Sequence, residues 1–364
     1  MILPMLARSL RRMQADREWR RVRDRWAERF QRVYAVDPGY ATPLAADVEQ
    51  EHVRYWARLV EPVHLDTLRV CGNISGRAPV RLVPEEVFVA AVEPELNDMP
   101  EAGFLAHKST YHRWFPDGYF PRTYLHRIGG DYCDPEFTAL GQQDVARIAA
   151  GLDYPLVVKP TWDAFGGQDI HFVTGPDQLL AVMATLPHAV AQERLAQHPH
   201  FQAFNPHGLN TLRVCVYRSV RTGEVHVLNT TLRMGVGGSL DNETAGGIVC
   251  SIDDDGTLNP FALDKHGRKF TAHPDTGIVF AEAPPLPDMA GLRACALDVA
   301  GKVLLARLSS LDMIMDADGR WRVLEVNLFG QTIRFSQYAG RPFFGDFTDE
   351  VVDWCLERRA AADR

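Results

Sequence analysis

The feature that most constrains the fold is residues 308–331, whose pattern is that of a β-hairpin. One strand is expected over 311–315 and a second over 321–327. Between them lies the pair Asp318-Gly319, and a glycine there supplies the positive φ that tight hairpin turns need.

This hairpin carries polar groups among apolar neighbours. Asp312 lies on the first strand, while Glu325 and Asn327, two residues apart, share one face of the second. Two carboxylates and an amide oxygen that converge form a hard, all-oxygen site suited to Mg²⁺ with phosphate ligands. The alternative is a half-buried hairpin whose acids face solvent.

The chain's bulk properties are those of a globular protein. Its length of 364 residues is greater than one simple hydrophobic core usually accommodates, which indicates two or three subdomains. The net charge of -8 argues against nucleic acid as the main partner, and no run of about 18 apolar residues predicts a transmembrane segment. The six cysteines form no CxxC pair, which disfavours structural zinc and a disulfide framework, and the N-terminus does not read as a signal peptide. We therefore expect a cytoplasmic protein.

Residues 1–35 predict a basic amphipathic helix. Apolar residues recur there at helical spacing among many arginines, including Arg17, Arg21, Arg25 and Arg29. Such a helix can pack at the periphery of the domain, or it can contact an anionic membrane surface or an acidic partner protein. A second helix is expected over 45–61, and weaker patterns suggest short strands at 68–71 and 84–92.

Two lysines and a glycine pair indicate a phosphate site. Lys108 precedes a short helix, and a strand over 154–160 ends with Lys159. Gly166 and Gly167 then lie in a loop, where backbone N–H groups without a Cβ can approach phosphate oxygens. The alternative is a plain glycine hairpin with Lys159 in solvent.

Further along, helices are expected over 134–152, 176–186 and 289–306, with a last one from residue 348. Strands are expected over 189–195, 210–217, 225–234 and 245–253. Arg213 and Arg233 fall on neighbouring strands and indicate either an anion site or surface ion pairs. Asp241 and Asn242 lie just ahead of the last of these strands, and His273 lies in a later loop as a candidate functional histidine.

Several nucleotide and hydrolase motifs are absent from the sequence. It contains no GxxxxGK[ST] loop, no complete GxGxxG fingerprint before a helix, no kinase HRD or DFG pair and no GxSxG elbow.

The order of the remaining motifs resembles the ATP-grasp superfamily, and within it the sugar-transfer-associated group. The resemblance covers roughly residues 100–345. It is carried by Tyr154-Pro-Leu-Val-Val-Lys159-Pro160 with Gly166-Gly167, Gln192-Glu193-Arg194-Leu195, Asn210-Thr-Leu-Arg213, Leu232-Arg233-Met-Gly235, Asp241-Asn242, His273-Pro-Asp-Thr-Gly277 and Leu324-Glu325-Val-Asn327.

The resemblance implies an α+β ATP-grasp fold, in which two subdomains clasp ATP, preceded by a helical extension. The implied divisions are an Arg-rich extension (1–60), a region with Lys108 (61–150), a small subdomain with the glycine flap (151–195) and a large subdomain with the metal site (196–364).

It also implies roles for named residues. Lys108, Lys159, Gly166 and Gly167 would bind phosphates. Gln192, Glu193 and the backbone of Leu195 would bind adenine. Asp312, Glu325 and Asn327 would hold Mg²⁺ or Mn²⁺, Arg213 and Arg233 would steady the transferring phosphoryl group, and Asn210, Asp241, Asn242 and His273 would bind substrate. The ribose carboxylate found in many relatives is missing, because residues 197–200 contain no acid.

The implied activity is that of a carboxylate–amine ligase that forms an acyl phosphate, with a possible setting in polysaccharide or glycoconjugate synthesis. The alternative is a phosphotransferase on the same fold, with His273 or Asp241 as a base near a sugar or small-molecule hydroxyl. A nucleotide-sensing scaffold is the non-enzymatic alternative, and the intact set of lysines and metal-type ligands disfavours it.

Overall fold

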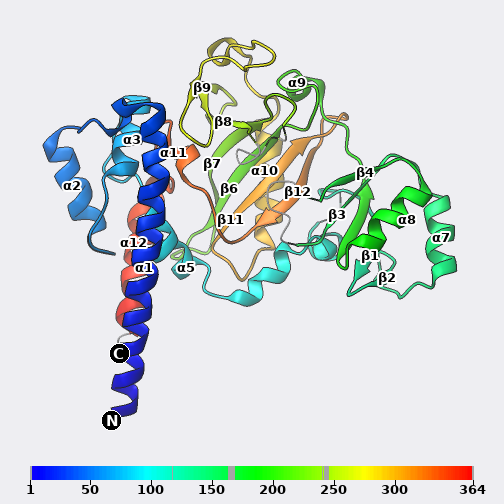
Figure 1. Cartoon of the computed structure of the whole chain (residues 1–364), viewed down its shortest axis with the longest axis horizontal. Helices are drawn as coiled ribbons and strands as arrows, with labels where there is room; N and C mark the ends of the chain where they lie inside the picture. Colours follow the sequence, from blue (N-terminus) through cyan, green and yellow to red (C-terminus); the bar gives the residue numbers. More distant parts are fainter. Residues whose placement is uncertain (1, 117, 163–168, 240, 242–245, 363–364) are drawn as a thin grey trace.

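The computed structural model describes residues 2–116, 118–162, 169–239, 241 and 246–362, with side chains described from Arg17 onward. Two antiparallel sheets lie side by side, with helices packed against each (Figure 1).

The larger sheet has seven strands in the order β10-β9-β8-β7-β6-β11-β12. Its strands are β6 (Thr211–Arg218), β7 (Val225–Met234), β8 (Ile248–Ile252), β9 (Leu258–Leu263), β10 (Lys269–Phe270), β11 (Leu308–Met315) and β12 (Trp321–Asn327). One face is apolar and packs against helix α10 (Met289–Gly301), with Leu212, Leu232 and Met313 fully buried between them. Hairpin β11–β12 confirms the expected strand pair.

The smaller sheet has five strands in the order β2-β1-β5-β3-β4. They are β1 (Thr123–Ile128), β2 (Asp131–Cys133), β3 (Leu156–Pro160), β4 (His171–Val173) and β5 (Ala189–Glu193). Helices α7 (Gln142–Ala150) and α8 (Pro176–Thr185) pack on one face through an apolar cluster that includes Val145, Val158 and Leu179. On the opposite face, the ring of His126 stacks with His112 and Phe137.

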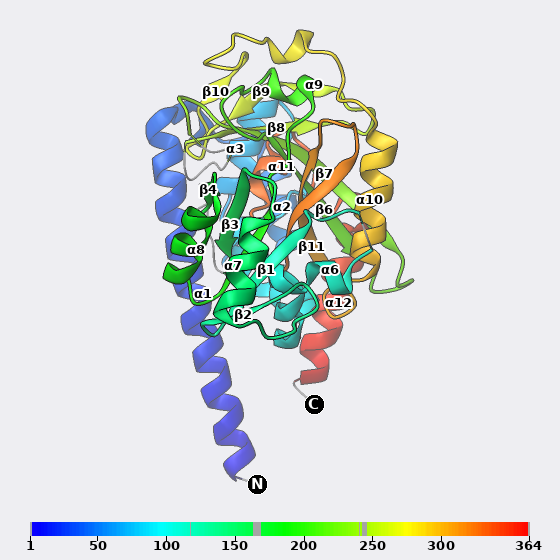
Figure 2. The same cartoon turned by 90° about the vertical axis from the view of Figure 1, so that its right-hand side faces the viewer.

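The N-terminal region forms a third layer beside the larger sheet (Figure 1). Its elements are α1 (Ile2–Val36), η1 (Pro38–Ala41), α2 (Ala46–Trp56), α3 (Asp66–Ser75), α4 (Glu85–Val87), the π-helical turn η2 (Phe88–Val92) and α5 (Glu93–Leu96). The C-terminal helix α12 (Thr348–Ala362) packs alongside this layer, and η2 contacts it directly. Helix α1 extends well beyond the body, on the side where α12 also ends (Figures 1 and 2).

Short helical segments make the remaining connections. These are η3 (Pro100–Ala106), η4 (Lys108–Thr110), α6 (Tyr111–Trp114), α9 (Pro199–Gln202), η7 (Phe280–Glu282), α11 (Arg334–Gln337) and η8 (Gly345–Phe347). No helix in the described ranges is both long and apolar enough to cross a membrane.

Three secondary-structure predictions are wrong. Residues 68–71 lie in helix α3, and four residues are too few to show its helical period. Residues 85–92 are helical as well, and they are buried on nearly every side, which hides the period. The helix expected over 134–152 begins only at Gln142. Before it, the Asp134 carboxylate accepts the backbone N–H groups of Glu136 and Thr138, which closes a local turn instead.

Candidate active site

The strand register gathers polar side chains on the face of the larger sheet opposite α10. Asp312 of β11 pairs directly with Glu325 of β12 on one side and with Arg213 of β6 on the other. Directly opposed residues on antiparallel strands point to the same face, so these three side chains are neighbours. Asn327 falls on the same face two residues from Glu325, and Thr231 lies opposite Arg213.

Asp312 is the centre of a buried ion network. The guanidinium of Arg213 donates to both of its carboxylate oxygens at 2.9 Å, and Nη1 of Arg233 donates at 3.1 Å. Burial alone would raise the pKa of Asp312, but the charges of Arg213 and Arg233 outweigh it and lower the pKa to about 2. The carboxylate is therefore ionised at neutral pH.

The two lysines join this network from the neighbouring segments. Nζ of Lys108 donates to Oε1 of Glu325 at 2.6 Å, and its backbone N–H bonds the carbonyl of Thr161 just after β3. Lys159, at the end of β3, is only 8% exposed, and within the described ranges its ammonium has neither a hydrogen-bond nor an ion-pair partner. Burial, reinforced by the charge of Lys108 and opposed by that of Glu325, lowers the pKa of Lys159 to about 7.

We expect the Lys159→Met variant to be more stable than the parent chain at pH 7 and to lose part of the parent's pH dependence. Between about pH 7 and the ordinary lysine value of 10.5, the unfolded chain holds a proton that the folded chain lacks, so the parent's stability rises with pH across that window. Urea unfolding from pH 7 to 10 measures this. Equal slopes in the two proteins would show that Lys159 does not titrate there.

The donor set beside Arg213 suits a hard divalent cation. Asp312, Glu325 and Asn327 present only carboxylate and amide oxygens as ligands, and the buried Nδ2 of Asn327 has no partner among the described residues, so its amide is not fully engaged by the protein. In the described part of the chain, no group of three or more His, Cys, Asp or Glu side chains is arranged to hold a metal ion. A metal at this face would therefore need the amide oxygen of Asn327 beside the two carboxylates.

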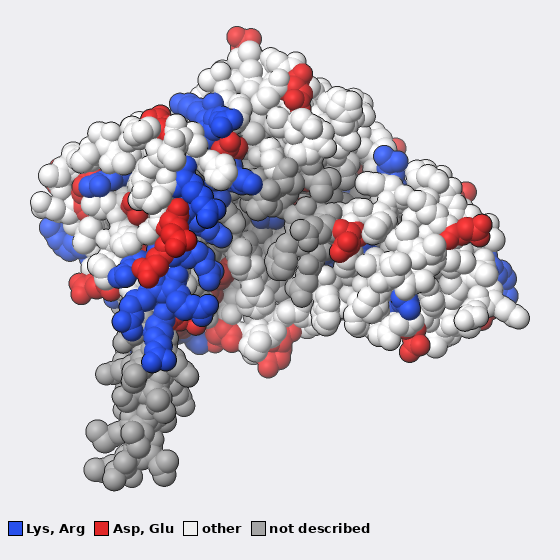
Figure 3. Space-filling model, viewed as in Figure 1, with Lys and Arg blue, Asp and Glu red and all other residues white. Residues whose placement is uncertain are grey.

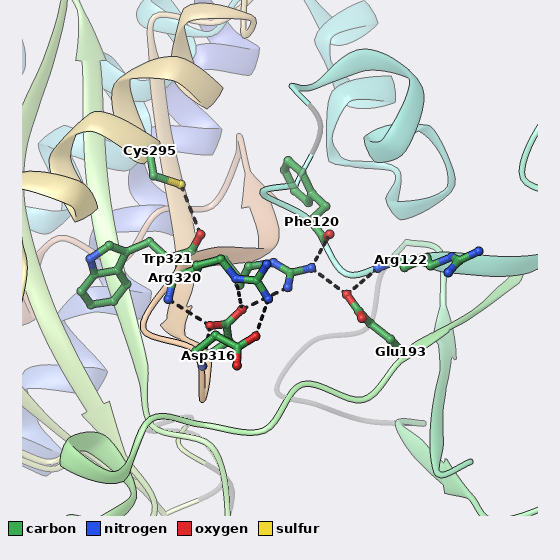
Figure 4. A network of polar contacts seen from close by, with 9 residues as sticks. Phe120, Arg122, Glu193, Cys295, Asp316, Arg320 and Trp321 are labelled. Atoms are coloured by element: carbon green, nitrogen blue, oxygen red, sulfur yellow. Dashed lines mark hydrogen bonds and ion pairs between the residues drawn. The ribbon is translucent and has the colours of Figure 1, made fainter. Parts of the chain in front are cut away.

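The end of β5 and the residues after it, called the hinge below, are where adenine is expected to bind. A second ion network lies there (Figure 4). The carboxylate of Glu193 accepts from Nη2 of Arg322 at 2.6 Å and from the backbone N–H of Arg122 at 2.9 Å. Arg322 also donates to Asp316 at 3.2 Å and to the carbonyl of Phe120 at 2.8 Å. The Glu193 carboxylate therefore ties β5 to β12, a role that the sequence did not reveal.

The other two expected adenine-binding residues, Gln192 and Leu195, are less engaged by the rest of the protein. Nε2 of Gln192 donates to the hydroxyl of Thr123 at 3.1 Å, while its buried Oε1 lacks a partner among the described residues. Leu195 is half-buried. A hollow of about 700 Å³ adjoins this region and is lined by residues that include Phe120, Arg122, Thr123, Tyr124 and Arg322. Its volume is within the range of small-molecule sites.

The candidate substrate residues separate into two groups. Asp241 accepts a hydrogen bond from the hydroxyl of Thr211 and lies near Arg233, and burial raises the pKa of its carboxyl. Asn210 and His273 are instead used inside the protein. The Asn210 amide bonds Gln197 and the carbonyl of Phe201, and the ring of His273 bonds the carbonyl of Gly235. Gly166, Gly167 and Asn242 lie outside the described residues.

The N-terminal layer is hydrogen-bonded to both ends of hairpin β11–β12, which carries Asp312, Glu325 and Asn327. The sequence did not predict these contacts. The side chain of Asn97 bonds the backbone of Leu308 at the start of β11 and the carbonyl of Leu328 after β12. The carboxylate of Glu93 accepts the backbone N–H of Gln331 at 2.8 Å. A buried asparagine and glutamate in a stretch rich in apolar residues were the available signal, since such groups need partners.

Comparison with known proteins identifies the fold family. Residues 177–345 match the family model described as sugar-transfer associated ATP-grasp. No curated protein matches the sequence. Similar solved structures include the ATP-grasp ligase PsnB in complex with a precursor variant, Mg and ADP, at 16% identity and TM-score 0.39, covering 71% of this chain and 62% of that one.

Two further similar structures are named as D-alanine ligases. The VanG D-Ala:D-Ser ligase from Enterococcus faecalis has 13% identity and TM-score 0.40, covering 72% of this chain and 63% of that one. The D-alanine–D-alanine ligase from Bacillus anthracis has 15% identity and TM-score 0.39, covering 71% and 70%. The chain thus spans less than two thirds of PsnB and of VanG, and likenesses of this size do not extend to a reaction. The family match confirms, over residues 177–345, the resemblance to sugar-transfer-associated ATP-grasp proteins that is seen in the sequence.

Proposed function

We propose that the protein is an ATP- and Mg²⁺-dependent ligase that joins a carboxylate to an amine or a similar nucleophile through an acyl phosphate. The observation that carries this proposal is Lys159. A buried ammonium without a partner in the described ranges lies beside Lys108, which in turn contacts the metal-type acid Glu325. An uncompensated buried cation is costly, and a phosphate group would supply the missing negative charge.

The flanking groups fit the remaining parts of a nucleotide complex. Asp312, Glu325 and Asn327 would hold Mg²⁺, which would neutralise phosphate charge. Gln192, with a free buried amide oxygen, Glu193 and the backbone of Leu195 would contact the base at the hinge, and Gly166 and Gly167 would cover the phosphates.

The transfer itself requires positioning and charge rather than a protein nucleophile. The substrate carboxylate would attack the γ-phosphorus, and the bond to the β-phosphate oxygen would break to release ADP. The amine would then attack the acyl carbon and expel inorganic phosphate, losing a proton. Arg213 and Arg233 would steady the charge on the transferring group. We assign the reaction to glycoconjugate or polysaccharide synthesis on the family description alone.

We expect hydroxylamine to intercept the acyl phosphate. With ATP, Mg²⁺ and a panel of amino acids and sugar acids, the productive acid should yield ADP and hydroxamate in equal amounts, measured by a coupled ADP assay and by iron(III) colour. Glu325→Gln should lower both by about 100-fold or more, the usual size for loss of a group that stabilises transition-state charge. Glu282→Gln, the same change at an exposed site, should leave both unchanged.

A phosphotransferase is the second candidate, because Asp241 lies beside Arg233 with a raised pKa and could accept a hydroxyl proton. The same assay separates the two reactions. ADP formed together with a phosphorylated alcohol, and no hydroxamate from any acid that supports turnover, would favour the kinase over the ligase.

A further inference from the structure

Helix α1 is anchored to the body by only one side of its second half. Val22, Trp26, Phe30 and Val33 follow each other in steps of three and four, and all are buried against a cluster that includes Leu68 of α3. This row accounts for how the helix is held, and it leaves the opposite face of α1 without a role in the fold.

The outward face of this half is rich in arginine. Figure 3 shows basic side chains gathered along α1. The exposed members between residues 17 and 32 are Arg17, Arg20, Arg21, Arg25, Arg29 and Arg32, against the exposed acids Glu18, Asp24 and Glu28. Like charges four residues apart on a helix repel. Arg17, Arg21 and Arg25 therefore place like charges side by side on this face, whereas Arg29 stacks on the ring of Trp26 at 4.5 Å.

The same helix face changes character toward the N-terminus. The positions Leu6, Leu10, Met13, Arg17 and Arg21 succeed each other in steps of three and four, so the helical period puts them in one row. Leucine and methionine positions thus precede the arginines on the face opposite the anchored one. They belong to the part of α1 that extends beyond the body (Figures 1 and 2).

We propose that this face of α1 binds an anionic lipid bilayer. A membrane interface accepts apolar side chains and arginines in one plane, with the apolar groups among the acyl chains and the guanidiniums at lipid phosphates. A nucleic acid or another soluble polyanion would satisfy the arginines but would leave the apolar positions on the projecting end in water. The chain's net charge of -8 means that this attraction is local to α1 and orients the protein at the surface.

The test is sedimentation of the full chain with vesicles. We expect it to bind phosphatidylcholine vesicles containing 30% phosphatidylglycerol about tenfold or more tightly than pure phosphatidylcholine vesicles, with binding weakened by 0.5 M KCl. Replacing Arg17, Arg21, Arg25 and Arg32 by glutamine should remove this preference. The matched control replaces four arginines away from α1 (Arg113, Arg147, Arg293 and Arg341) by glutamine, and it should bind like the parent.

A second variant tests the apolar positions separately. Leu6→Glu with Leu10→Glu should reduce binding to the anionic vesicles about tenfold, while circular dichroism and the thermal midpoint of the body stay unchanged. Absence of binding to anionic vesicles would overturn the proposal. So would equal loss in both arginine variants, or retention on polyaspartate or DNA without vesicle binding, which would instead identify a soluble polyanion as the partner.

Discussion

Replacing Asp312 by asparagine is expected to destabilise the protein by about 3–5 kcal/mol. The substitution keeps the shape of the side chain but removes its charge, which takes the carboxylate away from the buried guanidinium of Arg233 and the half-buried guanidinium of Arg213. Urea unfolding at pH 7 measures the loss. Asp318→Asn is the matched control, because this carboxylate lies in the turn of the same hairpin, 73% exposed, and surface ion pairs contribute about 1 kcal/mol or less.

The pH dependence of this effect gives an independent check. Arg213 and Arg233 hold the pKa of Asp312 at about 2, below its ordinary value of 3.8. A depressed carboxyl pKa contributes stability that is fully present above the unfolded value and is lost as pH falls toward the folded one. The parent and the Asp312→Asn variant should therefore differ by a constant amount above about pH 5 and converge between pH 4 and 2. A difference that does not change down to pH 2 would contradict a charged Asp312.

The same variant should lose ATP turnover by about 100-fold or more if Asp312 holds the metal as proposed. Circular dichroism at the assay temperature separates lost chemistry from lost structure. Full turnover in a folded variant would place the metal elsewhere, while leaving the stability prediction intact.

The sequence predicted those parts of the site that depend on local pattern. Their spacing of two residues put Glu325 and Asn327 on one face, and the Asp318-Gly319 turn fixed the hairpin. The register shift between Val323 and Glu325, which turns these two away from the core face of Trp321 and Val323, was not predicted. It could not show that Asp312 also lies against Arg213, because the two are 99 residues apart and only the register of β6 beside β11 makes them neighbours. Periodicity gives the face of a strand but not its neighbour.

Two different causes explain the failures in the N-terminal region. In helix α3 the half-buried residues Asp66, Arg69 and Asn73 do recur at helical spacing, but the four residues 68–71 span only about one turn and cannot show that period. Residues 85–92 are instead buried on nearly every side, which hides their helical period. Glu85 is an acid in the first turn of a helix, where such residues are usually exposed. It is nevertheless fully buried, and desolvation raises its pKa to about 8. Only tertiary contacts distinguish such a residue from an exposed one.

Arg322→Met is expected to cost about 3–5 kcal/mol, because it removes a buried guanidinium that serves three acceptors. Arg322 is 8% exposed and donates to Asp316, Glu193 and the carbonyl of Phe120. Methionine keeps the aliphatic volume, so the loss reports the charge rather than a cavity. The control is Arg320→Met. Arg320 contacts Asp316 in the same network but is 64% exposed, and its loss should cost about 1 kcal/mol or less.

Because Arg322 links the two sheets, its loss is also expected to affect ATP binding. Arg322 lies three residues before Glu325 on β12, and its partner Glu193 ends β5 of the other sheet, 129 residues away. Breaking this link should make the position of the small sheet relative to Asp312, Glu325 and Asn327 less fixed. KM for ATP should therefore rise by a larger factor than kcat falls. A double-mutant cycle with Glu193→Gln measures the link directly, with an expected coupling of about 1–3 kcal/mol. Coupling near zero, together with an unchanged KM, would mean that the two sheets are held together by other contacts.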